Sequence, residues 1–185
     1  VAVTGVQTCA LPIYAHNSLG FHTTGVVGPA AAAVAAGIVL GFDAGTLHNA
    51  VGIACSSASG IKAFTQGPGG MVKRTHAGRA AESGVLACLL AGKGFTGPLQ
   101  AIDGAFGLTH VFGGNTVNLA AIDADLGRAW AIGAVWIKVY PACGLIHSTL
   151  HAIERLRALT CPQSAQTSGR IGPRSRYPLP HLPRD

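Results

Sequence analysis

The sequence has 185 residues, of which 49% are hydrophobic and 11% are charged. This length and composition exclude a disordered chain and suffice for one domain with a hydrophobic core. The formal net charge is +6, but four arginines against one aspartate in residues 160–185 account for half of it. The other lysines and arginines form no basic stripe, which argues against a nucleic-acid-binding protein.

The composition predicts a mainly α fold. Alanine is abundant, there are 26 glycines, and aromatic residues make up 6% of the chain, which favours closely packed helices over a β-sandwich. The cysteines are five in number and form no CxxC pair, and the first residues lack the basic segment of a secretory signal. Reduced thiols and a cytoplasmic location are therefore expected. The cysteines are Cys9, Cys55, Cys88, Cys143 and Cys161.

Both ends differ from the body of the chain. Residues 3–13, VTGVQTCALPI, resemble the in-frame translation of a sequencing-adapter oligonucleotide, so we interpret residues 1–13 as adapter-derived. Residues 160–185 lose the helical period and are rich in Pro, Arg and Ser, which is typical of a disordered or frameshifted tail. The domain is therefore expected within residues 14–159.

The first predicted helix spans residues 29–40 and begins at Pro29, because proline is tolerated in the first turn of a helix. The apolar run over residues 26–42 is interrupted by this proline and is shorter than the roughly 20 residues of a membrane span. It therefore predicts a buried helix and no membrane association. A second helix is expected over residues 46–57, with Asp43 or Thr46 as its N-cap.

Two further helices are predicted in the second half of the chain, over residues 74–91 and 143–158. In the first of them, a hydrophobic stripe is expected to face the core; it consists of Val85, Leu86, Leu89 and Leu90. In the second, the inward face is expected to include Leu145, Ile146, Leu150, Ile153 and Leu156 or Leu159. All four predicted helices are expected to pack together.

The strongest candidate site lies in residues 67–84, GPGGMVKRTHAGRAAESG. The segment is not a P-loop, because Met71 and Val72 separate the glycines from the lysine. A helix that starts near Lys73 would carry Lys73 and His76 on one face beside small residues, which leaves room for a ligand. An ammonium group at a helix start favours a carboxylate. The alternative is a solvated first turn without a ligand.

Other histidines are weaker candidates. His22 lies in the loop GFHTTGVVG and is either a site residue or an ordinary surface residue. His147 and His151 have the i, i+4 spacing of metal ligands, but Ser148 stands where the HExxH motif has glutamate. No metal is therefore assigned. His48 and His110 are interpreted as structural.

Four segments resemble successive signatures of the MmgE/PrpD family, which includes 2-methylcitrate dehydratase and cis-aconitate decarboxylase. They are GFHTTGVVGPAAAAVAAGIVLGFD, HNAVGIACSSASGIKAF, GGMVKRTHAGRAAESGVLACLLAGKGFTGP and IKVYPACGLIHSTLHAI. The resemblance covers about residues 16–158. It implies a two-domain enzyme, with a helical domain and a smaller α+β lid, that acts on tricarboxylic acids without a metal or another cofactor.

The resemblance also implies roles for individual residues. His22, His76 and His147 would be catalytic, and Lys73 and Arg79 would bind the substrate, although Arg79 could instead pair only with Glu82. Fixed cations would hold the carboxylates, and a neutral imidazole would take a proton alpha to one of them. The family also uses an Asp and a His from an earlier segment, as well as residues of the lid, so this chain alone is expected to be inactive.

The function implied is that of a lyase fragment. Dehydration of a 2-methylcitrate-like acid is the first expectation, and decarboxylation or isomerisation within the family is the alternative. A catalytically inactive helical interaction module is the alternative from another class. For the complete protein the resemblance implies a homodimer.

Overall fold

The computed structural model describes residues 14–114, 118–135 and 137–160. The chain divides into two units, residues 1–135 and 136–185. The helices of the first unit are α2 (Tyr14–Ser18), α3 (Thr23–Val39), α4 (Ala44–Cys55), η2 (Lys62–Thr65), η3 (Gly70–Arg74), α5 (Thr75–Ala91), α6 (Leu108–Gly113), η5 (Leu119–Ala121) and η6 (Ala131–Ala134). The second unit contains η7 (Gly144–Ile146) and α7 (His147–Thr160).

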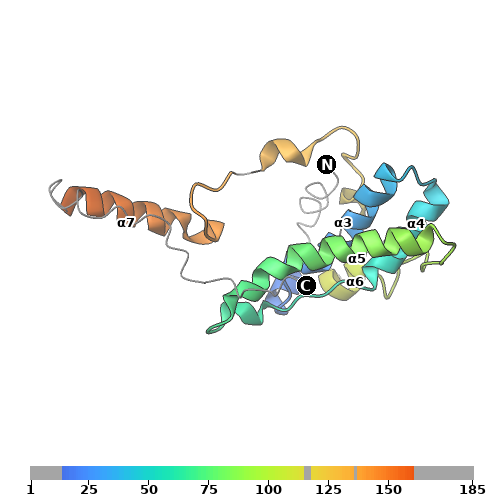
Figure 1. Cartoon of the computed structure of the whole chain (residues 1–185), viewed down its shortest axis with the longest axis horizontal. Helices are drawn as coiled ribbons and strands as arrows, with labels where there is room; N and C mark the ends of the chain where they lie inside the picture. The colour runs from blue at the N-terminus through green and yellow to red at the C-terminus, as the bar shows by residue number, and fades with distance from the viewer. Residues whose placement is uncertain (1–13, 115–117, 136, 161–185) are drawn as a thin grey trace, which may run out of the picture. The chain divides into compact units, whose positions relative to one another are not determined.

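Three helices, α3, α4 and α5, form the centre of the first unit and pack against one another (Figure 1). They confirm the helices predicted over residues 29–40, 46–57 and 74–91. The described residues contain no named strand, only an isolated antiparallel bridge between Phe21 and Ile61. The mainly α prediction is therefore confirmed.

The start of α3 differs from the prediction. The helix begins at Thr23, and Pro29 lies inside it. Proline has no N–H, so the carbonyl oxygen of Gly25, four residues earlier, loses its partner within the helix. The backbone N–H of Ser59 donates to that oxygen instead, at 3.1 Å. The loop that follows α4 thus completes the hydrogen bonding of α3, which explains how a proline is tolerated there.

The cap of α4 confirms one of the two predicted alternatives. Asp43 is the N-cap, and one of its carboxylate oxygens accepts the backbone N–H of Thr46 at 2.7 Å. This hydrogen bond lowers the pKa of the Asp43 carboxyl group, because it stabilises the charged form.

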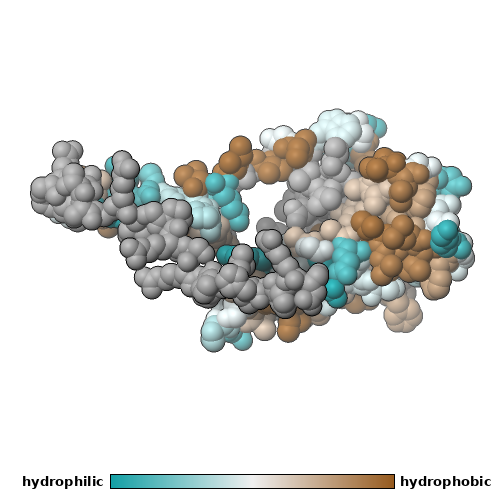
Figure 2. All heavy atoms as spheres, in the orientation of Figure 1, coloured by the Kyte–Doolittle hydropathy of each residue, from teal (hydrophilic) through white to brown (hydrophobic). Residues whose placement is uncertain are grey.

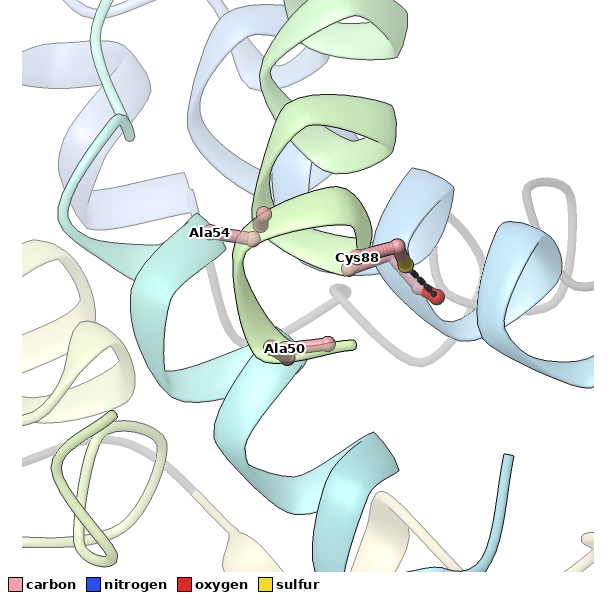
Figure 3. Packing of buried hydrophobic residues seen from close by; sticks show 6 residues of the cluster. Ala50, Ala54 and Cys88 are labelled. Atoms are coloured by element: carbon pink, nitrogen blue, oxygen red, sulfur yellow. Dashed lines mark hydrogen bonds between the residues drawn. The ribbon is translucent and has the colours of Figure 1, made fainter. Parts of the chain in front are cut away.

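Small side chains fill the core. The cluster consists of Ala33, Ala50, Ala54, Ala87, Cys88 and Ala91. Figure 3 shows Ala50 and Ala54 near Cys88, whose thiol donates to the carbonyl oxygen of Ala33 at 3.2 Å. Burial raises the pKa of the Cys88 thiol and raises that of Cys55 to about 11. Both thiols are free, and both are protonated at neutral pH.

The predicted inward stripe of α5 is wrong for three of its four residues, and only Leu90 is partly buried. Val85, Leu86 and Leu89 are 47%, 53% and 59% exposed, whereas the opposite small-residue face is buried. A Cβ atom at Gly84 would lie 2.6 Å from the backbone nitrogen of Ala33, so the helix backbones are too close for larger side chains. Hydrophobic side chains therefore remain on the surface of the molecule (Figure 2).

The second unit confirms a helix in the predicted range 143–158, since α7 spans His147–Thr160 directly after η7. Within this unit, Ile153, Leu156 and Leu159 are all exposed, so the predicted inward face of α7 stays a prediction. No second long helix among the described residues of this unit covers that face. The predictions for residues 1–13 and 161–185 lie outside the described residues.

No helix in the described part of the chain combines the length and hydrophobicity that a membrane crossing requires.

Buried His16 leads to a prediction for stability. Its Nε2 is hydrogen-bonded to Thr23 Oγ1 at 2.9 Å, and its Nδ1 is buried with no hydrogen-bond partner among the described residues. Burial, then the charges of Lys62 and His22, lower the pKa of His16 from its ordinary value of 6.5. Below this value the unfolded chain takes up a proton that the folded chain resists.

We therefore expect the stability contributed by neutral His16 to be complete above about pH 6.5 and to be lost as the pH falls towards the folded-state pKa. Urea unfolding at pH 7.5 and pH 5.5 measures this effect. A His16→Leu variant should depend less on pH, although His22, whose pKa is also lowered, retains part of the effect. Greater stability of the parent chain at pH 5.5 would contradict the prediction.

Candidate functional site

The site begins at His22, which directly precedes α3 as its N-cap residue. The backbone N–H of His22 donates to the carbonyl oxygen of Gly60 at 2.7 Å, next to the bridge between Phe21 and Ile61. On the side chain, His22 Nδ1 lies 2.9 Å from His76 Nδ1. Two histidines that are 54 positions apart in the sequence are thus hydrogen-bonded to each other.

Gly60 allows this pairing. Its φ angle is +105°, a left-handed conformation that side chains rarely adopt. A Cβ atom at this position would lie 3.2 Å from His76 Nδ1. The bare backbone of Gly60 therefore packs against the His76 ring while its carbonyl oxygen holds the backbone of His22. Gly60 could not be identified from the sequence, because a glycine after a serine cluster indicates only a turn.

The histidine pair can share one proton. Only one of the two Nδ1 atoms can donate in the hydrogen bond between them, so the bond does not persist when both rings are cationic. Burial, followed by the charges of His76, Lys73 and Lys62, lowers the pKa of His22. Because the cationic form is disfavoured, His22 is neutral near neutral pH and can accept a proton.

An aromatic ring joins the pair to a lysine. Phe64 in η2 makes edge-to-face contacts with His22 and His76, with centroid separations of 5.2 and 5.6 Å. The Nζ atom of Lys73 lies 5.6 Å from the centroid of the Phe64 ring, within the range of a cation–π interaction. Phe64 was missed because a single phenylalanine beside an exposed turn is normally interpreted as packing.

Lys73 and His76 both lie against Phe64, but Lys73 is not on the same α-helix as His76. Lys73 lies in η3, which leads directly into α5, and the turn before it contains Gly67 and Gly69 with positive φ angles. The idea that small neighbours leave room for a ligand is wrong for Ala80 and Gly84. Both are buried against α3, where a Cβ atom on Gly28 would lie 2.6 Å from that of Ala80.

Arg79 and His147 are the two other predicted site residues. The Nη1 atom of Arg79 donates to Oε2 of Glu82 at 2.7 Å, and both side chains are exposed. This is the alternative pairing considered for Arg79, and its role in substrate binding stays a prediction. His147 belongs to the second unit, where its ring is in edge-to-face contact with Tyr140 at 5.3 Å. Its catalytic role also stays a prediction.

No three His, Cys, Asp or Glu side chains within residues 14–114, 118–135 and 137–160 gather in a way that could hold a metal ion.

The fold and this cluster define an all-helical domain in which a hydrogen-bonded histidine pair and a lysine surround one aromatic ring. The sequence matches the MmgE/PrpD N-terminal domain over residues 4–120. The chain therefore belongs to the MmgE/PrpD family. The match includes most of the segment that we interpret as adapter-derived, an interpretation that stays a prediction.

Curated relatives extend the match beyond that domain. A cis-aconitate decarboxylase of Aspergillus terreus is 35% identical over 144 residues, which is 75% of this chain and 29% of the relative. A cis-aconitate decarboxylase-like protein, oryM, of Aspergillus oryzae is 33% identical over 146 residues, or 76% of this chain and 30% of the relative. The chain thus spans less than a third of the length of these relatives.

Proposed function

We propose that this chain supplies one wall of the active site of a lyase that acts on tricarboxylic acids. The hydrogen bond between His22 and His76, with Lys73 beside it, is the observation that carries the proposal. A tricarboxylate needs a fixed cation to hold it, and carbon chemistry next to a carboxylate needs a group that accepts or donates a proton. The cluster offers both kinds of group.

The division of roles follows from the chemistry of each group. The Lys73 ammonium group is proposed to bind a carboxylate of the substrate by a charge-assisted hydrogen bond. A neutral imidazole of the pair is proposed to exchange a proton with the carbon alpha to a carboxylate, while the second imidazole fixes its tautomer. His147 and Arg79 are proposed to complete the catalytic and binding groups, as the resemblance implies.

Dehydration, decarboxylation and isomerisation within the family remain candidates for this site. Dehydration of a 2-methylcitrate-like acid removes a proton from carbon and expels hydroxide, whereas decarboxylation of cis-aconitate releases CO2 and returns a proton to carbon. The names of the relatives favour decarboxylation. We therefore propose decarboxylation and dehydration as equally supported reactions. An assay of a complete family protein that contains this segment distinguishes them, because only decarboxylation releases CO2.

The binding role of Lys73 leads to a quantitative prediction. In a complete family protein that contains this segment, Lys73→Met keeps most of the side-chain stem and removes the charge. A charge-assisted contact contributes about 1.5–3 kcal/mol, so kcat/KM for the tricarboxylic acid should fall by about 10- to 100-fold. The melting temperature should hardly change, because the side chain is only partly buried.

Lys93→Met is the matched control, since Lys93 is exposed beyond the other end of α5. It should leave kcat/KM unchanged. Equal kinetics of Lys73→Met and the parent would contradict the binding role. A large loss of melting temperature in Lys73→Met would instead indicate a structural lysine.

A second candidate function is a catalytically inactive interaction module, which the exposed Val85, Leu86 and Leu89 on α5 favour. Titration of the 185-residue chain with cis-aconitate, followed by NMR, separates the two candidates. Shift changes at His22 and His76 support the proposed site, whereas an unperturbed spectrum favours the interaction module.

A further inference from the structure

Phe64 occupies an unusual position for a large aromatic residue. It lies in η2, a short 3₁₀ helix that contains no buried residue, and it is outside the hydrophobic cluster formed by α3, α4 and α5. Its neighbours Ala63 and Thr65 are exposed. Core packing therefore does not account for a phenyl ring at this position.

The contacts of the ring indicate another role. Its edge-to-face contacts have interplanar angles of 81° with His22 and 73° with His76, and the two imidazoles are themselves tilted by 46°. Three rings contact one another pairwise, so none can rotate without disturbing the other two. The same ring is within reach of Lys73 Nζ.

We propose that Phe64 is a positioning residue, which fixes the mutual orientation of the His22 and His76 imidazoles and keeps the Lys73 ammonium group beside them. The role in catalysis rests on the proposed function. The physical basis is that the hydrogen bond between two imidazoles is directional, whereas the ring contacts restrict each imidazole to one orientation. A cation–π contact adds a preference for the ammonium group on the same side.

The ring also contributes to the burial of His22. Burial is the largest cause of the lowered pKa of His22, and Phe64 is part of the surface that buries it. The titratable groups whose charges lower the pKa of His22 are His76, Lys73 and Lys62, and His22 in turn lowers the pKa of His16. His76, Lys73 and Lys62 all disfavour a further positive charge on His22. Removal of the phenyl ring should therefore raise the pKa of His22 towards its ordinary value.

Two variants test the proposal. Phe64→Leu keeps a hydrophobic side chain and removes the ring, and Phe64→Tyr restores the ring. NMR titration of the 185-residue chain reports the pKa of His22, and thermal unfolding reports stability. In a complete family protein that contains this segment, we expect Phe64→Leu to lower kcat by about 10- to 100-fold with a smaller change in KM, because misplaced reacting groups mainly slow the chemical step. Phe64→Tyr should restore both the kinetics and the titration of His22.

Phe42→Leu is the matched control, because Phe42 is a partly buried phenylalanine that packs against the helical core. It should lower the melting temperature and leave the pKa of His22 and the kinetics unchanged. The proposal is overturned if Phe64→Leu leaves the His22 titration unchanged, or if it unfolds the chain as a core substitution would. If the parent protein proves to have no lyase activity, the proposed function fails, but the titration still decides whether Phe64 positions the pair.

Discussion

Replacement of His22 or His76 by asparagine is expected to lower kcat by about 10²- to 10⁴-fold in a complete family protein that contains this segment, because general acid–base catalysis contributes about this much. Asparagine can take part in a hydrogen bond in place of an imidazole nitrogen but cannot transfer a proton at neutral pH. The substitution therefore preserves much of the contact of 2.9 Å between the two side chains while it removes the chemistry.

The double variant provides a sharper test of the pair. If the two imidazoles act as one unit that shares a proton, removal of either should cost almost as much as removal of both. His48→Asn is the matched control, since His48 is exposed and bonds through Nε2 to the carbonyl oxygen of Leu99 at 2.7 Å. Losses that add independently at His22 and His76 would contradict the shared-proton arrangement, and a loss at His48 would point to a general effect of removing a histidine.

The helices of the first unit could be predicted because their local signals agree with the packing. Asp43 caps α4 as its sequence position indicates, and the predicted ranges 29–40, 46–57 and 74–91 fall on α3, α4 and α5. The start of α3 could not be predicted in the same way. Ser59 donates to the carbonyl oxygen of Gly25 that Pro29 leaves without a partner in the helix, and nothing near Pro29 in the sequence indicates that distant donor.

The buried face of α5 was mispredicted for a physical reason. A rule based on hydrophobic period assigns the largest apolar side chains to the core, but in this helix the core face consists of alanine, glycine and cysteine. Small residues allow closer helix axes, and the dispersion attraction between the closely packed backbones replaces that of larger side chains. The signal was present in the small residues Ala80, Gly84 and Ala87, which follow one another at helical spacing.

The candidate site could be predicted in part. The three-residue spacing of Lys73 and His76 places them on neighbouring positions of one helical surface, and both lie against Phe64. The position of His22 in a loop made it only a weaker candidate, and the family resemblance alone joined it to Lys73 and His76, since no sequence spacing connects it with His76. The pairing depends on Gly60, which holds one histidine through its carbonyl oxygen and lies against the ring of the other.

The close approach of α3 and α5 leads to the largest expected effect on stability. Gly84→Leu should reduce the free energy of unfolding by about 3 kcal/mol or more. Overpacking of a dense core commonly costs about 1–3 kcal/mol, and leucine adds much more volume here than a single methyl group. A Cβ atom at Gly84 would already contact Ala32 and lie 2.6 Å from the backbone nitrogen of Ala33. The helices would have to separate, which would also open the Ala33–Cys88 contact.

Gly78, which also lies in α5, is the matched control for Gly84. A Cβ atom there has no neighbour within 4 Å, so Gly78→Ala should stabilise the chain by about 0.5–1 kcal/mol through the higher helix propensity of alanine. Gly84→Ala adds the same single methyl group and should have the opposite sign, destabilising the chain by about 1–3 kcal/mol. Urea unfolding of the two alanine variants and Gly84→Leu measures all three effects. Stabilisation by Gly84→Ala would contradict the close packing of α3 against α5. The small-residue face would then have room for larger side chains, and the exposure of Val85, Leu86 and Leu89 would lose its explanation.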